Sequence, residues 1–185
     1  MIRTIISLRL FFDDNRQDLL KRGLTTPTPL AYNNSVRKGN PTMKTIWFDM
    51  DGTIANLYGV DNWLDKLIAE DETPYAEAKP LLNMSQLAKE LNRLTRQGYA
   101  VNIISWLSKG ASQAYNEKVS KAKRAWLKKH LKSVQFAQID IVEYGTPKYI
   151  NRNGILFDDE QQNRAQWKGR AYEPKEILNQ LKKLK

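Results

Sequence analysis

The sequence predicts an α/β fold in which a doubly wound parallel sheet carries a small helical cap. Four short apolar runs have the length and the β-branched or aromatic content of buried strands, and they lie at residues 44–48, 100–105, 136–142 and 154–158. Amphipathic helical patterns separate several of these runs. Strands that alternate with helices favour a parallel sheet that is covered on both faces.

Residues 1–42 precede the first strand and lack its pattern. They have neither helical nor strand periodicity, and turn-forming residues are frequent between 25 and 41. The apolar start is interrupted by Arg9, and no small-residue cleavage site follows it, so a secretory signal is not expected. We therefore expect residues 1–42 to be a poorly ordered, dispensable N-terminal extension and residues 43–185 to form the folded domain.

Three helices are predicted from the spacing of apolar residues. The first carries leucines at helical spacing from 87 to 94 and ends at Gly98. The second is a long amphipathic helix at 112–131, and the last begins at Pro174. The positions expected to face inward on the last two helices are Tyr115, Val119, Ala122, Trp126, Ile177, Leu181 and Leu184.

The segment at about 56–83 predicts the small cap. It is too long for a simple loop between a strand and a helix, and it is rich in apolar residues around Trp63. Two interpretations are open for its aromatic residues Tyr58, Trp63 and Tyr75. They either stack on a nucleobase or form the small core of the cap itself.

The composition excludes several classes of site. The chain of 185 residues has no cysteine and one histidine, His130. Disulfides, thiol nucleophiles, iron–sulfur clusters, cysteine-ligated zinc and histidine-rich metal sites are therefore excluded. The absence of cysteine permits a reducing compartment, and no run approaches the roughly 20 apolar residues of a membrane span. We expect a soluble, cytoplasmic protein without a membrane partner.

The net charge of +10 is unevenly distributed along the chain. Residues 49–77 are strongly acidic, whereas residues 118–132 are strongly basic. Such a balance is typical of nucleic-acid binders, but also of basic enzymes that act on phosphorylated substrates. Charge alone does not decide between these classes, and the sequence does not determine the oligomeric state.

Carboxylates follow two of the predicted strands directly. Asp49 and Asp51 lie two residues apart on the turn that leaves the first strand, where Gly52 allows the backbone to bend closely. Asp158 and Asp159 follow the fourth strand. Ligands of open α/β sheets bind beyond the carboxyl ends of the strands, so we expect these acids to meet there. Such oxygen ligands suit a hard divalent cation, for which Mg²⁺ is the natural candidate.

Ser105 and Lys148 complete the predicted site. Ser105 ends the second strand with a hydroxyl and a loop amide, and Lys148 offers a fixed positive charge. Both groups can stabilise the equatorial oxygens of a phosphoryl group. Taken alone, each residue has an ordinary structural explanation, and an Asp-x-Asp-Gly sequence also occurs in turns. Their assignments therefore depend on one another.

In this order, the residues resemble the four motifs of the haloacid dehalogenase (HAD) superfamily of aspartate-dependent phosphatases. Residues 49–53 resemble its first motif, Ser105 the second, Lys148 the third, and Asp158 with Asp159 the fourth. The resemblance covers roughly residues 43–167. The segments that are most similar to 5′(3′)-deoxyribonucleotidases lie at 123–126, 146–148 and 155–159.

The chain departs from that narrower family directly after Ser105. Those nucleotidases usually follow the second-motif hydroxyl with a small residue and a proline, whereas Trp106 and Leu107 stand here. The bulk of Trp106 puts the shape of the substrate pocket in question.

The resemblance implies a HAD-like Rossmannoid core and a phosphomonoester hydrolase that works through an aspartyl-phosphate. Asp49 would be the nucleophile and Asp51 the general acid and base. Ser105 and Lys148 would bind the phosphoryl oxygens. The magnesium ligands would be Asp49, Asp51 through its backbone carbonyl, Asp158 and Asp159. The expected substrate is a small phosphorylated molecule, a nucleoside monophosphate and in particular a deoxyribonucleotide.

Two alternatives remain open from the sequence. The first is a phosphatase that acts on DNA or RNA ends and uses the basic helix at 118–132 to bind nucleic acid. The second is a noncatalytic phosphate-binding module of the same fold. The residues also leave open which of Asp158 and Asp159 ligates the metal directly.

Overall fold

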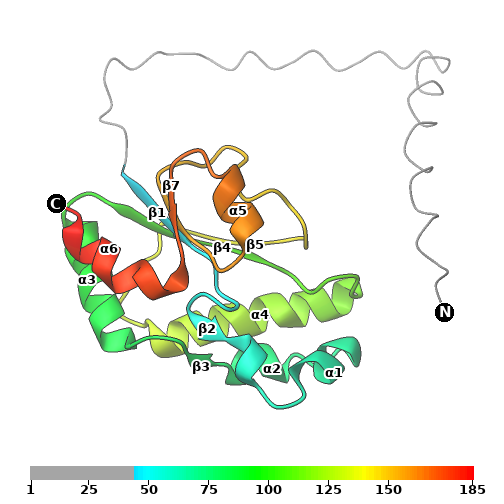
Figure 1. Ribbon diagram of the computed structural model, residues 1–185. Coiled ribbons are helices and arrows are strands. Elements are labelled where there is room, and N and C mark those ends of the chain that lie inside the picture. The colour runs from blue at the N-terminus through cyan, green and yellow to red at the C-terminus, as the bar shows by residue number, and fades with distance from the viewer. Residues whose placement is uncertain (1–43) are drawn as a thin grey trace, which may run out of the picture. The chain divides into compact units, whose positions relative to one another are not determined.

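The computed structural model describes residues 44–185, and the expectation about residues 1–42 lies outside this part (Figure 1). A parallel five-stranded sheet has the order β5-β4-β1-β6-β7. Its strands are β1 (Thr45–Phe48), β4 (Ala100–Trp106), β5 (Gln138–Val142), β6 (Ile155–Phe157) and β7 (Arg170–Tyr172).

The four predicted strands are present, and a fifth is added. The third strand begins at Gln138, two residues later than the apolar run suggested. Strand β7 was not predicted, because its three residues are too few to show a period. It pairs in parallel with β6 and forms one edge of the sheet.

The order of the strands shows that the sheet is doubly wound. From β1 the chain moves outward to β4 and β5, returns to β6 on the other side of β1, and continues to β7. Helices α3 (Met84–Arg96) and α4 (Gln113–His130) make the outward crossovers, and α5 (Gln161–Gln166) makes the last one. Because parallel crossovers share one handedness, reversing direction places α5 on the opposite face, as Figure 1 shows. The predicted fold class is confirmed.

Each face of the sheet has its own apolar core. Alternate strand residues such as Phe48 and Phe157, whose rings stack at 5.0 Å, pack against α3, α4 and α6 (Ile177–Lys183). The 3-10 turn η2 (Pro174–Glu176) leads into α6. Trp47 and its neighbours pack with Trp167 on the other face. Full burial of each large side chain contributes about 1.5–3 kcal/mol, so both faces hold the strands that carry the acids.

Local signals in the sequence set the helix boundaries. Asn83 Oδ1 accepts a hydrogen bond from the backbone N–H of Gln86, and Ser112 Oγ accepts one from Tyr115. Gly98 has φ +85°, the left-handed conformation that ends α3. Each helix between residues 44 and 185 is too short or too polar to cross a membrane.

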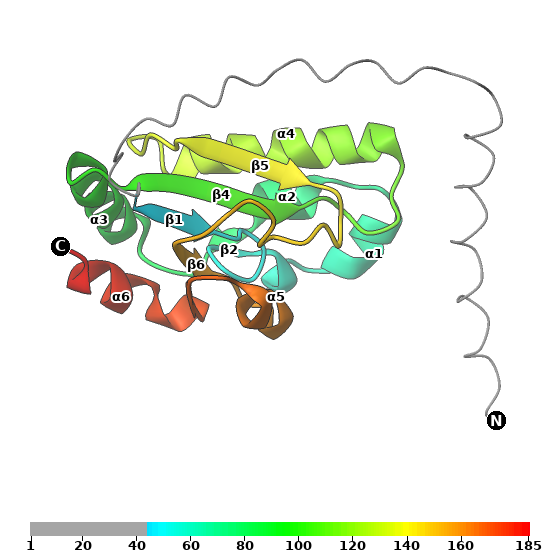
Figure 2. The same cartoon turned by 90° about the horizontal axis from the view of Figure 1, so that it is seen from above.

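Between β1 and α3 the chain forms a small insertion, residues 55–80. Its elements are β2 (Ala55–Asn56), η1 (Leu57–Gly59), α1 (Trp63–Ile68), α2 (Thr73–Glu77) and β3 (Lys79–Pro80). Strands β2 and β3 pair in antiparallel fashion. Tyr75 of α2 packs on Tyr115 and Val119 of α4, and both figures show α1 near the start of α4 (Figure 2). Action of the insertion as a cap stays a prediction.

Candidate active site

The register of the sheet brings the predicted acids together. Phe48 pairs with Phe157, so Asp49 and Asp158 leave adjacent parallel strands at the same level. The backbone N–H of Asp49 donates to the carbonyl of Phe157 at 2.9 Å, which continues the ladder by one residue. Strand β4 lies on the other side of β1 and carries Ser105 to the same edge. The site therefore lies at the switch point of the sheet.

Lys148 links the two aspartates that follow β1 and β6. Its Nζ lies 2.8 Å from Asp49 Oδ1 and 2.7 Å from Asp158 Oδ2, and its side chain is 2% exposed. Burial lowers the pKa of the Lys148 ammonium, but Asp49 and Asp158 outweigh this effect and raise the pKa above its usual value. A permanent positive charge is thus held against both carboxylates.

The carboxylate of Asp158 is held entirely by protein donors. Its Oδ1 accepts from the backbone N–H of Glu160 at 2.9 Å and from Asn163 Nδ2 at 3.1 Å. Its Oδ2 accepts from Lys148 and, at 3.3 Å, from Asn163. Burial and the charge of Asp49 raise the pKa of Asp158, although Lys148 lowers it. The side chain is fully buried and is a structural centre of the site.

Asp159 is held at one oxygen only. Thr53 Oγ1 donates to Asp159 Oδ1 at 3.2 Å and accepts from the Asp159 backbone N–H at 3.0 Å. Neither of these two hydrogen bonds involves Asp159 Oδ2. Burial, followed by the charges of Asp49 and Asp158, raises the pKa of Asp159 to about 7.

Three of the acids can share a cation. One carboxylate oxygen each from Asp49, Asp158 and Asp159 lie within 4.8 Å of one another. Closely spaced carboxylates repel each other unless a positive charge lies between them, and hard oxygen ligands suit Mg²⁺. The donor set therefore fits this metal. The Asp51 carboxylate lies outside the group, and ligation through its backbone carbonyl stays a prediction.

Asp51 and Ser105 meet at a residue that the sequence analysis missed. Lys123 Nζ lies 2.5 Å from Asp51 Oδ2 and 2.9 Å from Ser105 Oγ, with its side chain 1% exposed. Burial raises the pKa of Asp51, Lys123 lowers it, and Asp49 raises it, with a net increase. The site thus contains two buried lysines, each paired with an aspartate of the turn after β1.

A signal for Lys123 was present in the sequence. The apolar stripe of α4 includes Val119 and Trp126, and residue 123 lies four positions after the first and three before the second. Helical spacing therefore places it on the buried face. A lysine on such a stripe is almost never fully buried unless it is paired, so its position predicts an acidic partner.

The turn after β1 requires glycine at residue 52. Gly52 has φ +71°, and a Cβ there would collide with Asp159 Oδ2 and lie 2.8 Å from the Tyr58 ring. The Met50 carbonyl accepts hydrogen bonds from three successive N–H groups of the turn, at residues 53–55. The glycine predicted from the motif therefore allows the Asp159 side chain to approach the turn.

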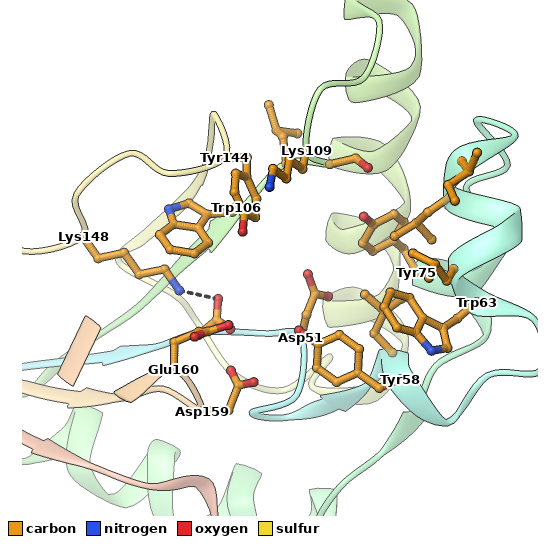
Figure 3. Close-up of a pocket in the computed structure, with 17 residues that line it drawn as sticks. Asp51, Tyr58, Trp63, Tyr75, Trp106, Lys109, Tyr144, Lys148, Asp159 and Glu160 are labelled. Carbon is orange, nitrogen blue, oxygen red and sulfur yellow. Dashed lines mark ion pairs between the residues drawn. The ribbon is translucent and has the colours of Figure 1, made fainter. Parts of the chain in front are cut away.

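A cavity of about 340 Å³ opens beside the acids (Figure 3). Asp49, Asp51, Lys148 and Asp159 line it, whereas the fully buried Ser105 and Asp158 lie behind its surface. The other lining residues are Leu57, Tyr58, Trp63, Leu64, Leu67, Ile68, Tyr75, Trp106, Leu107, Ser108, Lys109, Tyr144 and Glu160.

Aromatic side chains form two sides of this cavity. In Figure 3, Tyr58, Trp63 and Tyr75 lie on the side of the insertion, and Trp106 and Tyr144 lie on the side of Lys148. Tyr58 and Trp63 meet edge to face at 5.1 Å. Burial raises the pKa of Tyr58 and Tyr75 above the usual value, so both are neutral phenols at neutral pH.

Trp106, the departure from the nucleotidase pattern, has a fixed place in the site. Its Nε1 donates to the Thr146 carbonyl at 2.8 Å, and its ring stands 5.1 Å from that of Tyr144. The Lys148 ammonium lies 4.6 Å from the centre of the Trp106 ring. The indole therefore forms one wall of the cavity and contacts the lysine that holds Asp49 and Asp158.

No protein-family model matches the chain, and no curated protein matches it. Solved structures do match, among them a D,D-heptose 1,7-bisphosphate phosphatase from Burkholderia thailandensis. It has 17% sequence identity and a TM-score of 0.42, and the match covers 66% of this chain and 70% of that chain. A second match is the D,D-heptose 1,7-bisphosphate phosphatase from B. bronchiseptica complexed with magnesium and phosphate. It has 15% sequence identity and a TM-score of 0.45, and the match covers 75% of this chain and 87% of that chain. A chain of a Pnkp1/Rnl/Hen1 complex matches with 19% sequence identity and a TM-score of 0.43, and the match covers 88% of this chain and 60% of that chain. These values are too low to transfer a family, a substrate or an activity to this chain.

Proposed function

We propose that the protein is a magnesium-dependent phosphomonoester hydrolase in which Asp49 is the nucleophile. The observation that carries this proposal is the position of Asp49, which lines the cavity while Lys148 holds one of its oxygens. Asp51, two residues away, lines the same cavity. An attacking carboxylate, an acid beside it and a fixed positive charge are the groups that phosphoryl transfer needs.

The reaction proceeds in two steps, formation and hydrolysis of an aspartyl-phosphate. In the first, an Asp49 oxygen forms a bond to phosphorus while the bond from phosphorus to the ester oxygen breaks, and Asp51 gives a proton to that oxygen. In the second, Asp51 takes a proton from water, whose oxygen attacks the aspartyl-phosphate and releases phosphate. Lys148 pairs with Asp49 Oδ1, so Asp49 Oδ2 is the oxygen that we assign to the attack.

The hydrogen bonds of the fourth motif support different roles for its two aspartates. Asp158 has both oxygens fully engaged with Lys148, Glu160 and Asn163, whereas Asp159 keeps Oδ2 free. Asp159 would therefore ligate Mg²⁺ directly, and Asp158 would contribute through Lys148. Bound Mg²⁺ would neutralise the carboxylates and the phosphoryl charge.

The phosphoryl oxygens are bound by the remaining predicted residues. Lys148 faces the cavity from the side opposite the insertion and offers its charge to one oxygen. Ser105 lies at the same edge of the sheet, where its hydroxyl and the following loop can serve a second oxygen. Both contacts strengthen as negative charge develops in the transition state.

For the substrate we favour a nucleoside monophosphate, in particular a deoxyribonucleotide. The walls of the cavity away from the acids are apolar and aromatic, and Tyr58 and Trp63 come from the insertion above the acids. A flat base can stack on such side chains. Residues 55–80 thus serve as the cap of the domain.

A second substrate class is supported by the surface of α4. Its exposed basic residues are Lys118, Lys121, Arg124, Lys128 and Lys129. Such a row can track the phosphates of a DNA or RNA strand whose end enters the cavity. In that case, hydrolysis of oligonucleotide ends falls steeply with salt, and hydrolysis of mononucleotides does not.

A substrate screen tests the proposal. The full chain is assayed with nucleoside monophosphates, sugar phosphates and phosphorylated oligonucleotides, with Mg²⁺ and with excess chelator. We expect phosphate release from nucleotides that requires Mg²⁺, and its loss by at least a factor of about 1,000 in Asp49→Asn, an isosteric variant without the nucleophile. Phosphate binding without release from any substrate would identify a noncatalytic module. Full activity in chelator, or in Asp49→Asn, would contradict the mechanism.

A further inference from the structure

Lys123 has a complete set of hydrogen-bond acceptors. Its Nζ donates to Asp51 Oδ2 at 2.5 Å, to Ser105 Oγ at 2.9 Å and to the Trp106 carbonyl at 2.5 Å. An ammonium has three N–H donors and no acceptor, so these three contacts use all of them. The charged form of the side chain therefore matches its surroundings in both charge and number of donors.

The contact with Ser105 determines the role of the hydroxyl. Ser105 Oγ accepts from Lys123, so the hydroxyl hydrogen is free for another acceptor. Ser105 is fully buried at the switch point of the sheet. Lys123 therefore leaves this hydroxyl able to donate a hydrogen bond, which is what an oxygen of a phosphoryl group requires.

The contact with Asp51 fixes a side chain that would otherwise be loosely held. Among residues 44–185, Lys123 is the hydrogen-bond partner of the Asp51 carboxylate, and it reaches this residue from a different element, α4. The Tyr75 ring, 5.0 Å from Nζ, packs on the ammonium. The aspartate is thus oriented by a lysine that is itself fixed by three acceptors and a ring.

Stability alone does not account for a lysine at this position. Replacing buried ion pairs by apolar residues of similar volume is often neutral or stabilising, because two charges lose their hydration on burial. Residue 123 lies on the apolar stripe of α4, where a methionine or leucine would continue the core. The charged pair is therefore better explained by what it does to Asp51 and Ser105.

We propose that Lys123 is a positioning residue for the reaction, which holds the Asp51 carboxyl in line with the ester oxygen that leaves and directs the Ser105 hydroxyl to the phosphoryl group. This inference rests on the proposed function. The step that it serves is the transfer of the Asp51 proton to the ester oxygen as the bond between that oxygen and phosphorus breaks. Lys123 itself does not touch the reacting atoms.

Leaving-group dependence tests the inference. The variants are Lys123→Met, which keeps the volume without the charge, and Lys89→Met, a control at an exposed lysine of α3. Each is assayed with p-nitrophenyl phosphate, whose leaving group needs little protonation, and with a nucleoside 5′-monophosphate, whose alkoxide needs it. We expect Lys123→Met to lose about 100-fold or more in kcat on the nucleotide, and about 10-fold or less on p-nitrophenyl phosphate. Lys89→Met should lose neither activity.

The possible outcomes separate this inference from the proposed function. An equal loss on both esters would show that Lys123 has only a structural role and would overturn the inference. A native chain that hydrolyses neither ester contradicts the proposed function instead. Crystal structures of the native chain and Lys123→Met then decide about Lys123: an unmoved Asp51 carboxylate overturns the inference, and a displaced one supports it. If Lys123→Met fails to fold in thermal denaturation, Lys123→Gln, an uncharged donor, replaces it in both tests.

Discussion

Gly52 and Asp159 approach so closely that a Cβ at residue 52 would occupy the place of the Asp159 carboxylate. The two residues belong to the first and last motifs of the site and are far apart in sequence. Because of this contact, the backbone of the turn after β1 lies directly against Oδ2 of the Asp159 carboxylate. The absence of a side chain at residue 52 is therefore a condition for the geometry of the acids.

We predict that Gly52→Ala abolishes magnesium binding and turnover. The new methyl group would displace Asp159 and press on Tyr58, in addition to about 1–2 kcal/mol of strain from the positive φ. The matched control is Gly98→Ala, where φ is +85° but no atom lies within 4 Å. Calorimetric Mg²⁺ titration should show loss of binding in the first variant only, and equal losses in both would show that strain, not the collision, is responsible.

Lys148→Met should destabilise the fold as well as remove activity. The variant leaves Asp49 and Asp158 buried without their shared cation, and breaking a buried pair in this way costs about 3–5 kcal/mol. Urea denaturation in chelator measures the change. The double variant Lys148→Met with Asp158→Asn should recover part of the loss, because one uncompensated charge is removed. No recovery would mean that Lys148 stabilises the fold through packing on Trp106 instead.

The acids predict an unusual dependence of stability on pH when divalent cations are removed. Burial raises the pKa of Asp159 from its ordinary value of 3.8 to about 7 in the fold, and the pKa of Asp158 rises too. The folded state then binds protons more tightly than the unfolded state, so this contribution is present at acid pH and is lost as pH rises toward 7.

In chelator, the free energy of unfolding should therefore fall between pH 5 and pH 8, by about 1 kcal/mol from Asp159 after allowance for solvent screening at this half-buried group. Asp159→Asn should flatten the profile, and saturating Mg²⁺ should restore stability at pH 8. Thermal denaturation across this range measures both. A profile that is identical in the native chain and in Asp159→Asn would show that Asp159 has an ordinary pKa.

Trp63→Ala should change substrate selectivity without removing the chemistry. Trp63 lines the cavity away from the acids and packs edge to face on Tyr58. Loss of one stacking side chain should raise KM for nucleoside monophosphates about tenfold and leave kcat/KM for small phosphate esters nearly unchanged. The comparison uses kcat/KM over both substrate panels. If the nucleotide selectivity is unchanged, the aromatic residues form only the core of the insertion.

The strands that carry the acids could be predicted from the sequence because their signals are local. Asp49 directly follows the run 44–48, Asp158 is the last residue of the run 154–158, and the structure has a strand of the sheet within each run. The α5 helix and the β7 strand could not be found in this way. They are short, and their position depends on pairing with β6 and on packing of Trp167 against the second core.

The site could be predicted only as a set of residue types. The motif spacing indicated that Asp49, Lys148 and Asp158 act together, and the structure brings them into contact. The register that sets Asp49 level with Asp158 is a property of pairing between distant strands and has no local signature. Lys123 was overlooked for a different reason: it lies in the basic run 118–132, which the sequence suggested only as a surface for nucleic acid.

The hydrogen bonds of Ser112 attach the insertion to the start of α4. The Ser112 N–H and hydroxyl both donate to the Glu70 carboxylate, at 2.7 Å each, while the hydroxyl caps α4. These bonds lower the pKa of Glu70, so the attachment persists in mild acid. Within the described chain, α1 buries no side chain completely. Helix α1 is therefore anchored just beyond its C-terminal end, at Glu70, and is otherwise only partly buried. The backbone amide hydrogens of α1 should exchange faster than those of α2.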